Sequence, residues 1–313
     1  MLGRRLLHSL LMLFLLLTSV FFLIRLIPGG PFESDRILAP EIQVQLETVF
    51  GLRDPLPIQY LNWLCSIARG ELGVSFQQPE YTVRELIRLA LPISLGLGSM
   101  ALLVAFLLAV PIGVLSAYAL ENQRYRFLDQ VIRILVLCAT SVPGFLLAYG
   151  LVWVFSIQLG WLPPGLWAEL LDRPAYWVLP TLTLALRPLA LISRQIRGST
   201  LEALRQDYIR TARAKGLSQP RVLLRHALRN AWIPVIGLFP PIAAQLLTGS
   251  FLVESIFQIP GLGRSFVNAV LNRDYFMVLG STLVFGVVLI VANLGSEALL
   301  LWADPRTRRQ ESP

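Results

Sequence analysis

Residues 91–120 read LPISLGLGSM ALLVAFLLAV PIGVLSAYAL, thirty residues without an Asp, Glu, Lys or Arg. A helix of this length, rising 1.5 Å per residue, covers the ~30 Å hydrocarbon core of a bilayer. Inside lipid the backbone must satisfy its own hydrogen bonds, so the run is predicted to be a helix. Five further apolar runs can also cover the hydrocarbon core as helices: Leu6–Leu23, Val131–Ile157, Tyr176–Ile192, Ala231–Val253 and Val278–Trp302. The sequence therefore predicts an all-α membrane protein with six transmembrane helices.

Composition agrees with this fold class, because 55% of the residues are hydrophobic and only 15% are charged. Soluble domains carry about 25% charged residues and have no such runs. The first run follows Arg4 and Arg5 and has features of a signal peptide. It is nevertheless about as long as a bilayer requires, and no small-x-small cleavage site follows it. We therefore expect a retained first transmembrane helix at residues 1–27.

Residues 28–90 differ from the rest, with eight acidic residues, five arginines and turn-forming sequence such as Asp54-Pro55-Leu56-Pro57. We interpret this segment as a small insert outside the membrane. Short helices are predicted within it, around Glu41–Val49 and Pro57–Ala68.

Basic residues are distributed unevenly between the two sides of the predicted membrane. An even number of spans places both termini on one side, and most of the chain's Lys and Arg lie on that side. They are Arg4, Arg5, Arg124, Arg126, Arg133, Arg194, Arg197, Arg205, Arg210, Arg213, Lys215, Arg221, Arg225, Arg229, Arg306, Arg308 and Arg309. The positive-inside rule then places both termini, including a tail at 304–313, in the cytoplasm and the acidic insert outside. Topology thus accounts for the net charge of +8, and no nucleic-acid partner is expected.

Prolines interrupt the predicted spans at positions 111, 143, 180, 188, 234, 240 and 241. A proline removes a backbone donor and bends a helix. Ordinary kinks and a bundle with an internal cavity both account for this pattern.

The loop at residues 193–230 is too long for a simple turn. Ser199 with Glu202 three residues later has the form of a capping box, and apolar residues then recur at helical spacing. Gly216 is a helix stop, and Ser218 with Pro220 predicts the start of a second helix that runs to Asn230. An interfacial helix whose arginines contact anionic head groups would explain these features. A helix-turn-helix DNA reader has a similar outline, but a tether between two spans disfavours it.

Residues 207–217 read DYIRTARAKGL and resemble the ATPase-docking loop of type I ABC importer permeases. The general pattern of that loop is Glu-Ala-Ala, three residues, then Gly. Here the Glu is absent and one Ala is kept, a form similar to the peptide/nickel branch. The resemblance continues in HALRN at 226–230, VESIF at 253–257, PGLG at 260–263, RDY at 273–275, DPR at 304–306 and RLIPG at 25–29. It covers nearly the whole chain, and the insert after the first span is similar to that of B-type permeases.

The resemblance implies the type I permease fold, with a transmembrane core at 91–303, in the cytoplasmic (inner) membrane of a bacterium. It implies a transport subunit, not an enzyme, that carries di- or oligopeptides or related small solutes. The implied partners are a second homologous permease, two ATP-binding cassette ATPase subunits and an extracytoplasmic substrate-binding protein. The implied coupling residues are Tyr208, Arg210, Thr211, Ala212, Arg213, Ala214, Lys215, Gly216 and Leu217.

Residue types in this loop suit a docking role, since Ala212, Ala214 and Gly216 are small and would allow close approach. Arg210, Arg213 and Lys215 could pair with acidic groups of a partner. A P-loop needs Gly-x4-Gly-Lys-Ser/Thr, which the chain lacks. We therefore expect ATP and Mg²⁺ on the partner subunits and no cofactor on this chain.

Charged residues inside the predicted spans are few: Arg25, Arg187, Glu254 and Glu297. Charged residues near the ends of spans are expected to extend their side chains to the membrane surface, which is called snorkelling. Glu254 is the exception, because it precedes Pro260, Gly261 and Gly263, and we hypothesise that these four residues shape an outer gate. An ion-coupled secondary transporter is the alternative function, but it predicts midplane charges and inverted repeats, which the sequence does not show. An intramembrane enzyme or a metal site is not expected, because no catalytic motif is present and the only histidines are His8 and His226.

Overall fold

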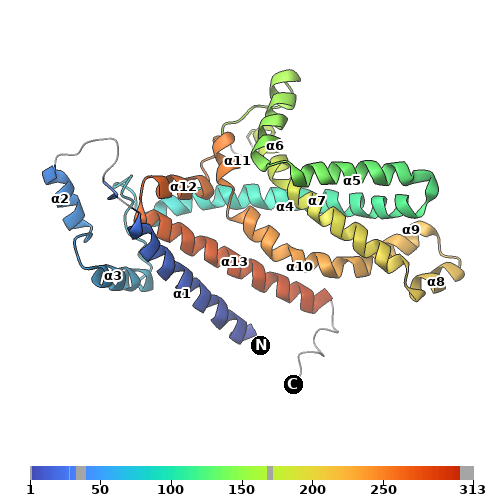
Figure 1. Cartoon of the computed structure of the whole chain (residues 1–313), viewed down its shortest axis with the longest axis horizontal. Coiled ribbons are helices and arrows are strands. Elements are labelled where there is room, and N and C mark those ends of the chain that lie inside the picture. The colour runs from blue at the N-terminus through green and yellow to red at the C-terminus, as the bar shows by residue number, and fades with distance from the viewer. Residues whose placement is uncertain (1, 28, 33–39, 168–171, 304–313) are drawn as a thin grey trace. The chain divides into compact units, whose positions relative to one another are not determined.

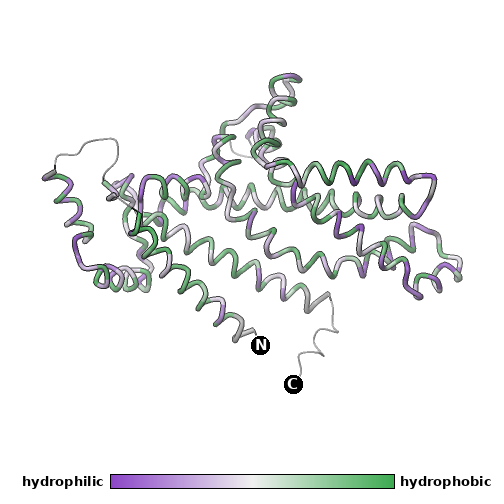
Figure 2. The backbone as a smooth tube through the Cα atoms, in the orientation of Figure 1, coloured by the Kyte–Doolittle hydropathy of each residue, from purple (hydrophilic) through white to green (hydrophobic). Residues whose placement is uncertain are grey.

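The computed structural model describes residues 2–27, 29–32, 40–167 and 172–303; the predicted tail at 304–313 lies outside them. Within these ranges the secondary structure is helical, apart from an isolated antiparallel bridge between Val74 and Thr82. Hydrophobic residues run along most of the long helices (Figures 1 and 2). The all-α prediction is confirmed.

Among the described residues, five helical segments are long and apolar enough to cross a membrane: Leu6–Leu26, Val83–Glu121, Ala175–Leu204, Gln219–Ile256 and Tyr275–Leu299. A bent pair of helices, Arg126–Ser141 with Gly144–Gln158, is long and apolar enough when its two parts are taken together. The number of spans therefore agrees with the sequence prediction when the bent pair counts as one span.

The sequence predicted one transmembrane helix at Val131–Ile157, but this segment is broken in two. Helix α5 (Arg126–Ser141) ends before Pro143, and α6 (Gly144–Leu151) continues as a π-helical segment, Val152–Gln158, at 111° to α5. Val142 is extended, with φ −79° and ψ 129°. The ring of a proline disfavours the helical conformation in the residue before it, which explains the break.

The chain divides into two compact units. The first comprises residues up to Ser94 together with Pro260–Ile290, and the second comprises Leu95–Ile259 together with the residues from Val291 onward. Helices α4 (Val83–Glu121) and α13 (Tyr275–Ala303) contribute to both units.

The first unit contains α1 (Leu2–Leu26), α2 (Pro40–Val49), α3 (Leu56–Ala68) and α12 (Leu262–Leu271). Helices α2 and α3 form where short helices were predicted. Phe76, Val83, Leu262 and Val278 share one buried cluster, so the segment after α3 packs against α4, α12 and α13. A second cluster joins Phe21 of α1 to Trp63 of α3.

Asp274 ties the segment after α3 to the start of α13. Its carboxylate accepts hydrogen bonds from the Ser75 hydroxyl (2.5 Å), the Phe76 N–H (3.1 Å) and the Met277 N–H (3.1 Å). The bond from Met277, three residues on, is that of an N-cap. One buried side chain thus caps α13 and holds a loop that lies far away in sequence.

The second unit is built on close contact between α4, α7 (Ala175–Leu204) and α10 (Leu228–Leu247). Ala101, Ala105 and Ala109 recur every four residues on one face of α4 and are fully buried. Small residues allow membrane helices to approach closely. At Gly113 an added Cβ would lie 2.6 Å from the Ser193 carbonyl oxygen, so the backbones of α4 and α7 meet there.

The remaining described elements are short. They are a 3₁₀ turn at Gln123–Tyr125, α8 (Asp207–Ala214), α9 (Gln219–Arg221), a π-helical segment at Val222–Ala227 and α11 (Phe251–Ile256).

Candidate coupling site

The candidate site is α8, which lies between the end of α7 and the start of α9. The segment between α7 and α9 is shorter than the predicted loop at 193–230, because α7 continues to Leu204 and α9 begins at Gln219. The capping-box interpretation of Ser199 and Glu202 was wrong, since both residues lie inside α7. An N-cap residue has a non-helical backbone, and Gln206, with φ −78° and ψ 153°, occupies that position for α8.

The inner face of α8 is held by hydrophobic packing. Ile209 and Ala212 are buried in a cluster with Ala203, Leu204, Val222, Leu223 and Ala227, and Tyr118 and Leu217 pack against it. The helix is therefore attached to α4, α7 and the segment that leads into α10. Ala212 packs against this chain, which leaves Ala214 and Gly216 as the small residues at the surface.

The carboxyl end of α8 is a Schellman motif at the predicted stop. Gly216 has φ +75°, its N–H donates to the Arg213 carbonyl (2.9 Å), and the Leu217 N–H donates to the Ala212 carbonyl (3.3 Å). Glycine adopts this left-handed conformation without steric cost. A Cβ at Gly216 would meet nothing within 4 Å, so the requirement for glycine is one of backbone conformation.

The outer face of α8 is polar and basic. Tyr208, Arg210, Thr211, Arg213, Ala214, Lys215 and Gly216 are exposed. Arg210 pairs with Asp207 at 3.2 Å, but both side chains are largely exposed, so the pair adds little stability. Arg213 pairs with Glu121 at the end of α4, and the Asn230 amide donates to the Tyr208 hydroxyl (2.8 Å). These contacts orient a cationic surface that presents small residues at one end.

The gate candidates fall in both units. Glu254 is completely buried in α11, its N–H donates to the Ser250 carbonyl (2.8 Å), and its carbonyl accepts from the Ile259 N–H (2.7 Å). Pro260 is exposed, whereas Gly261 and Gly263 are buried at the start of α12. The unit boundary lies between Ile259 and Pro260.

One polar cluster was missed by the sequence analysis. The buried Asp129 of α5 accepts hydrogen bonds from Arg197 Nε (2.8 Å) and Nη2 (3.1 Å) of α7 and from the Ser116 hydroxyl (2.5 Å) of α4. Arg133 adds an ion pair at 3.2 Å. The local signal for this cluster was Asp129 with Arg133 four positions later, at the start of an apolar run. No feature near Asp129 in the sequence indicated Arg197, which is 68 residues away.

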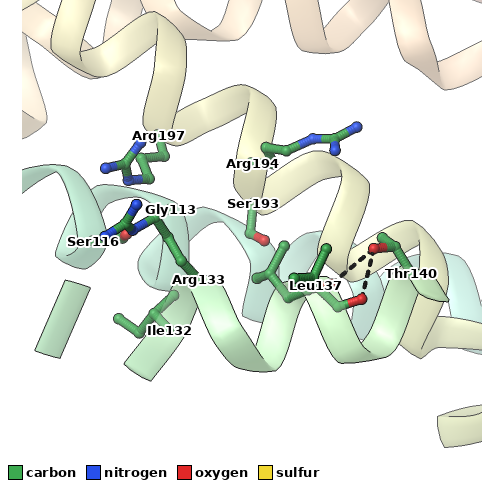
Figure 3. Close-up of a pocket in the computed structure, with 10 residues that line it drawn as sticks. Gly113, Ser116, Ile132, Arg133, Leu137, Thr140, Ser193, Arg194 and Arg197 are labelled. Carbon is green, nitrogen blue, oxygen red and sulfur yellow. Dashed lines mark hydrogen bonds between the residues drawn. The ribbon is translucent and has the colours of Figure 1, made fainter. Parts of the chain in front are cut away.

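Next to this cluster lies a cavity of about 270 Å³ within the second unit (Figure 3). Its lining comes from α4, α5 and α7: Gly113, Ser116, Ile132, Arg133, Val136, Leu137, Thr140, Ser193, Arg194 and Arg197. Three of these side chains are guanidinium groups and the others are apolar, small or hydroxylated.

The helical spans and the exposed basic surface of α8 together describe a multi-pass membrane protein with a polar loop between two spans. Residues 109–309, more than half of the chain, match the family described as "Binding-protein-dependent transport system inner membrane component". The chain belongs to this family, and the resemblance to type I ABC importer permeases is confirmed. It is a multi-pass protein of the bacterial inner membrane and a transport component, not an enzyme.

Individual relatives match over nearly their whole length. The chain is 41% identical to the oligopeptide transport system permease protein OppB of Haemophilus influenzae over 305 residues, 97% of this chain and 98% of the relative. It is 39% identical to OppB of Escherichia coli K12 with the same coverage. It is 38% identical to the dipeptide transport system permease protein DppB of Bacillus subtilis, covering 93% of this chain and 92% of the relative.

Proposed function

We propose that the chain is the permease subunit of an ATP-driven importer of di- or oligopeptides. The observation that carries this proposal is the full-length similarity to relatives named for oligopeptide and dipeptide transport. The uncharged stretch of residues 91–120 and the scarcity of charges inside the other spans favour an ATP-driven system over a proton-coupled transporter, whose proton relay uses ionisable groups within the spans.

ATPase subunits are proposed to dock on α8 and the turn that follows it. Exposed Tyr208, Arg210, Thr211, Arg213, Ala214, Lys215 and Gly216 form the contact surface, and buried Ala212 and half-buried Leu217 fix the helix to the rest of the permease. ATP and Mg²⁺ bind to those partners. Shifting a two-state equilibrium from 1:99 to 99:1 takes about 5.5 kcal/mol of differential binding. Closure of the ATPase dimer supplies that energy, and α8 transmits it as a lever.

The same proposal includes a second permease, an extracytoplasmic binding protein and cytoplasmic termini. The excess of arginines on one side of the predicted spans supports the orientation and places the insert at 28–90 outside. Glu254 with the turn at Pro260, Gly261 and Gly263 is proposed to set the geometry of an outer gate. Glu254→Gln would then reduce transport, and a variant that assembles and transports normally would remove this role.

A pull-down in mild detergent, followed by uptake in proteoliposomes, tests the proposal. The tagged chain should recover P-loop ATPases and a second six-span permease. Peptide uptake should require ATP and persist with a protonophore. Recovery of the chain alone, with ATP-independent uptake, would favour an ion-coupled transporter instead.

A matched pair of glycine variants tests the docking surface. Gly216→Glu should abolish uptake and ATPase recovery. Gly70→Glu is the control, because Gly70 also has a positive φ (+78°) and open space around its Cβ position, but follows α3. Equal losses in both variants would show a general effect of strain and would contradict docking at α8.

A further inference from the structure

The cavity between α4, α5 and α7 carries more positive charge than its own chain neutralises. Arg133, Arg194 and Arg197 line it, and Asp129 supplies the carboxylate that pairs with Arg133 and Arg197. Arg194 is exposed, and its guanidinium makes no hydrogen bond or ion pair with another residue of the described ranges. In Figure 3, Arg133 and Arg197 extend toward Ser116, whereas Arg194 points away from them. The site thus has a net charge of two positive units and one unused guanidinium.

Arg133 and Arg194 lie on the same predicted side of the membrane, each near one end of its apolar run. Arg133 is two residues after the start of the run 131–157, and Arg194 is two residues after the end of the run 176–192. This end is the arginine-rich side of the chain. The cavity is therefore at the level where hydrocarbon meets lipid head groups, not at mid-membrane.

One wall of the cavity is apolar. Ile132, Val136 and Leu137 contribute this wall. Ile134, Leu135 and Leu137 of α5 are 52–63% exposed in the chain. An amphipathic ligand fits this arrangement, with an anion against the arginines and a hydrocarbon chain along α5.

We propose that this cavity binds the phosphate of an anionic phospholipid. Basic pockets between transmembrane helices near the cytoplasmic surface bind such head groups, because guanidinium pairs strongly with phosphate oxygens. The lipid phosphate contacts Arg194, and the Asp129 carboxylate holds Arg133 and Arg197 near Ser116. The acyl chain lies along the exposed face of α5. This inference depends on the membrane location and not on the transported solute.

Native mass spectrometry of the full chain, released from nanodiscs of phosphatidylglycerol and phosphatidylethanolamine, tests the proposal. The protein should retain phosphatidylglycerol selectively. Arg194→Gln should lower that retention about five-fold, the effect expected for one basic residue near anionic lipid. Arg225→Gln is the matched control, because Arg225 is exposed and lies outside the cavity, and it should retain the wild-type amount.

Three outcomes would overturn the assignment. These are no selective retention by the wild type, an equal loss in the Arg225 control, and equal thermal stabilisation by inorganic phosphate and by phosphatidylglycerol. A photoreactive residue in place of Leu137 gives an independent readout, since Leu137 lines the cavity and is exposed. It should cross-link to lipid; cross-linking to a second permease without lipid would identify a protein as the occupant.

Discussion

Removing the buried carboxylate of Asp129 is predicted to destabilise the permease. This carboxylate is about 1% exposed and receives two hydrogen bonds from Arg197 and one from Ser116, and it also pairs with Arg133. Removing one partner of a buried pair costs about 3–5 kcal/mol, since the other charge is left without compensation. The Arg197 side chain is 21% exposed, so water recovers part of the loss. We expect Asp129→Ala to cost about 3 kcal/mol.

Thermal unfolding in mild detergent measures this effect. A loss of about 3 kcal/mol corresponds to a fall in Tm of roughly 5 °C for a chain of 313 residues, because the unfolding entropy is about 2.1 cal/mol/K per residue. Asp129→Ala with Arg197→Met should recover much of the loss, because an apolar pair of similar size often replaces a buried ion pair without penalty. Asp207→Ala is the control, since that ion pair is exposed, and its effect should stay within about 1 kcal/mol.

Two results from these variants would refute the reasoning. If Asp129→Ala unfolds at the wild-type temperature, the carboxylate does not stabilise the junction of α4, α5 and α7. If the double variant is as unstable as Asp129→Ala, the uncompensated charge of Arg197 is not the cause of the loss.

Three further predictions concern other parts of the chain. Gly216→Asn should retain ATPase recovery in a pull-down, whereas Gly216→Val should lower it by up to about five- to thirty-fold, since a left-handed backbone costs most residues roughly 1–2 kcal/mol; wild-type recovery in the Val variant would contradict this. Asp274→Ala leaves the Ser75 hydroxyl and the Phe76 N–H without their acceptor, so limited proteolysis should cleave near residue 75 at least about ten-fold faster; unchanged cleavage would show that Asp274 does not hold the loop. Pro143→Ala restores a backbone donor, so spin labels at the far ends of α5 and α6 should move apart as the 111° bend opens; an unchanged distance would assign the bend to packing.

Patterns within single segments predicted the helices well. The apolar runs found the spans, and short local signals found α2 and α3, because these features depend on residues close together in sequence. Gly216 was predicted as the end of a helix and ends α8 with a positive φ. Each of these predictions needed only the length of a segment or the conformational preference of one residue.

Features that depend on distant residues were not predictable. The Ser199–Glu202 motif has the form of a capping box, but α7 continues through it because Ile196, Thr200 and Leu204 remain on a buried face. Several prolines lie within continuous helices, including Pro180 and Pro188 of α7. At Pro143 the helix does break, and no local sequence feature distinguishes this proline from those that lie within continuous helices. The Asp129–Arg197 pair joins residues 68 positions apart, so only the folded chain reveals it.

The bond between Ser75 and Asp274 also sets an order of events during synthesis. The two residues are 199 positions apart. A ribosome adds about 5–20 residues per second, so Ser75 waits roughly 10–40 s before Asp274 is made. During that interval the segment after α3 lacks the acceptor that later secures it, and α1 and α3 are already complete. Helix α13 therefore completes a structure that begins to form near α1. During this interval the segment after α3 is most accessible to proteases and chaperones.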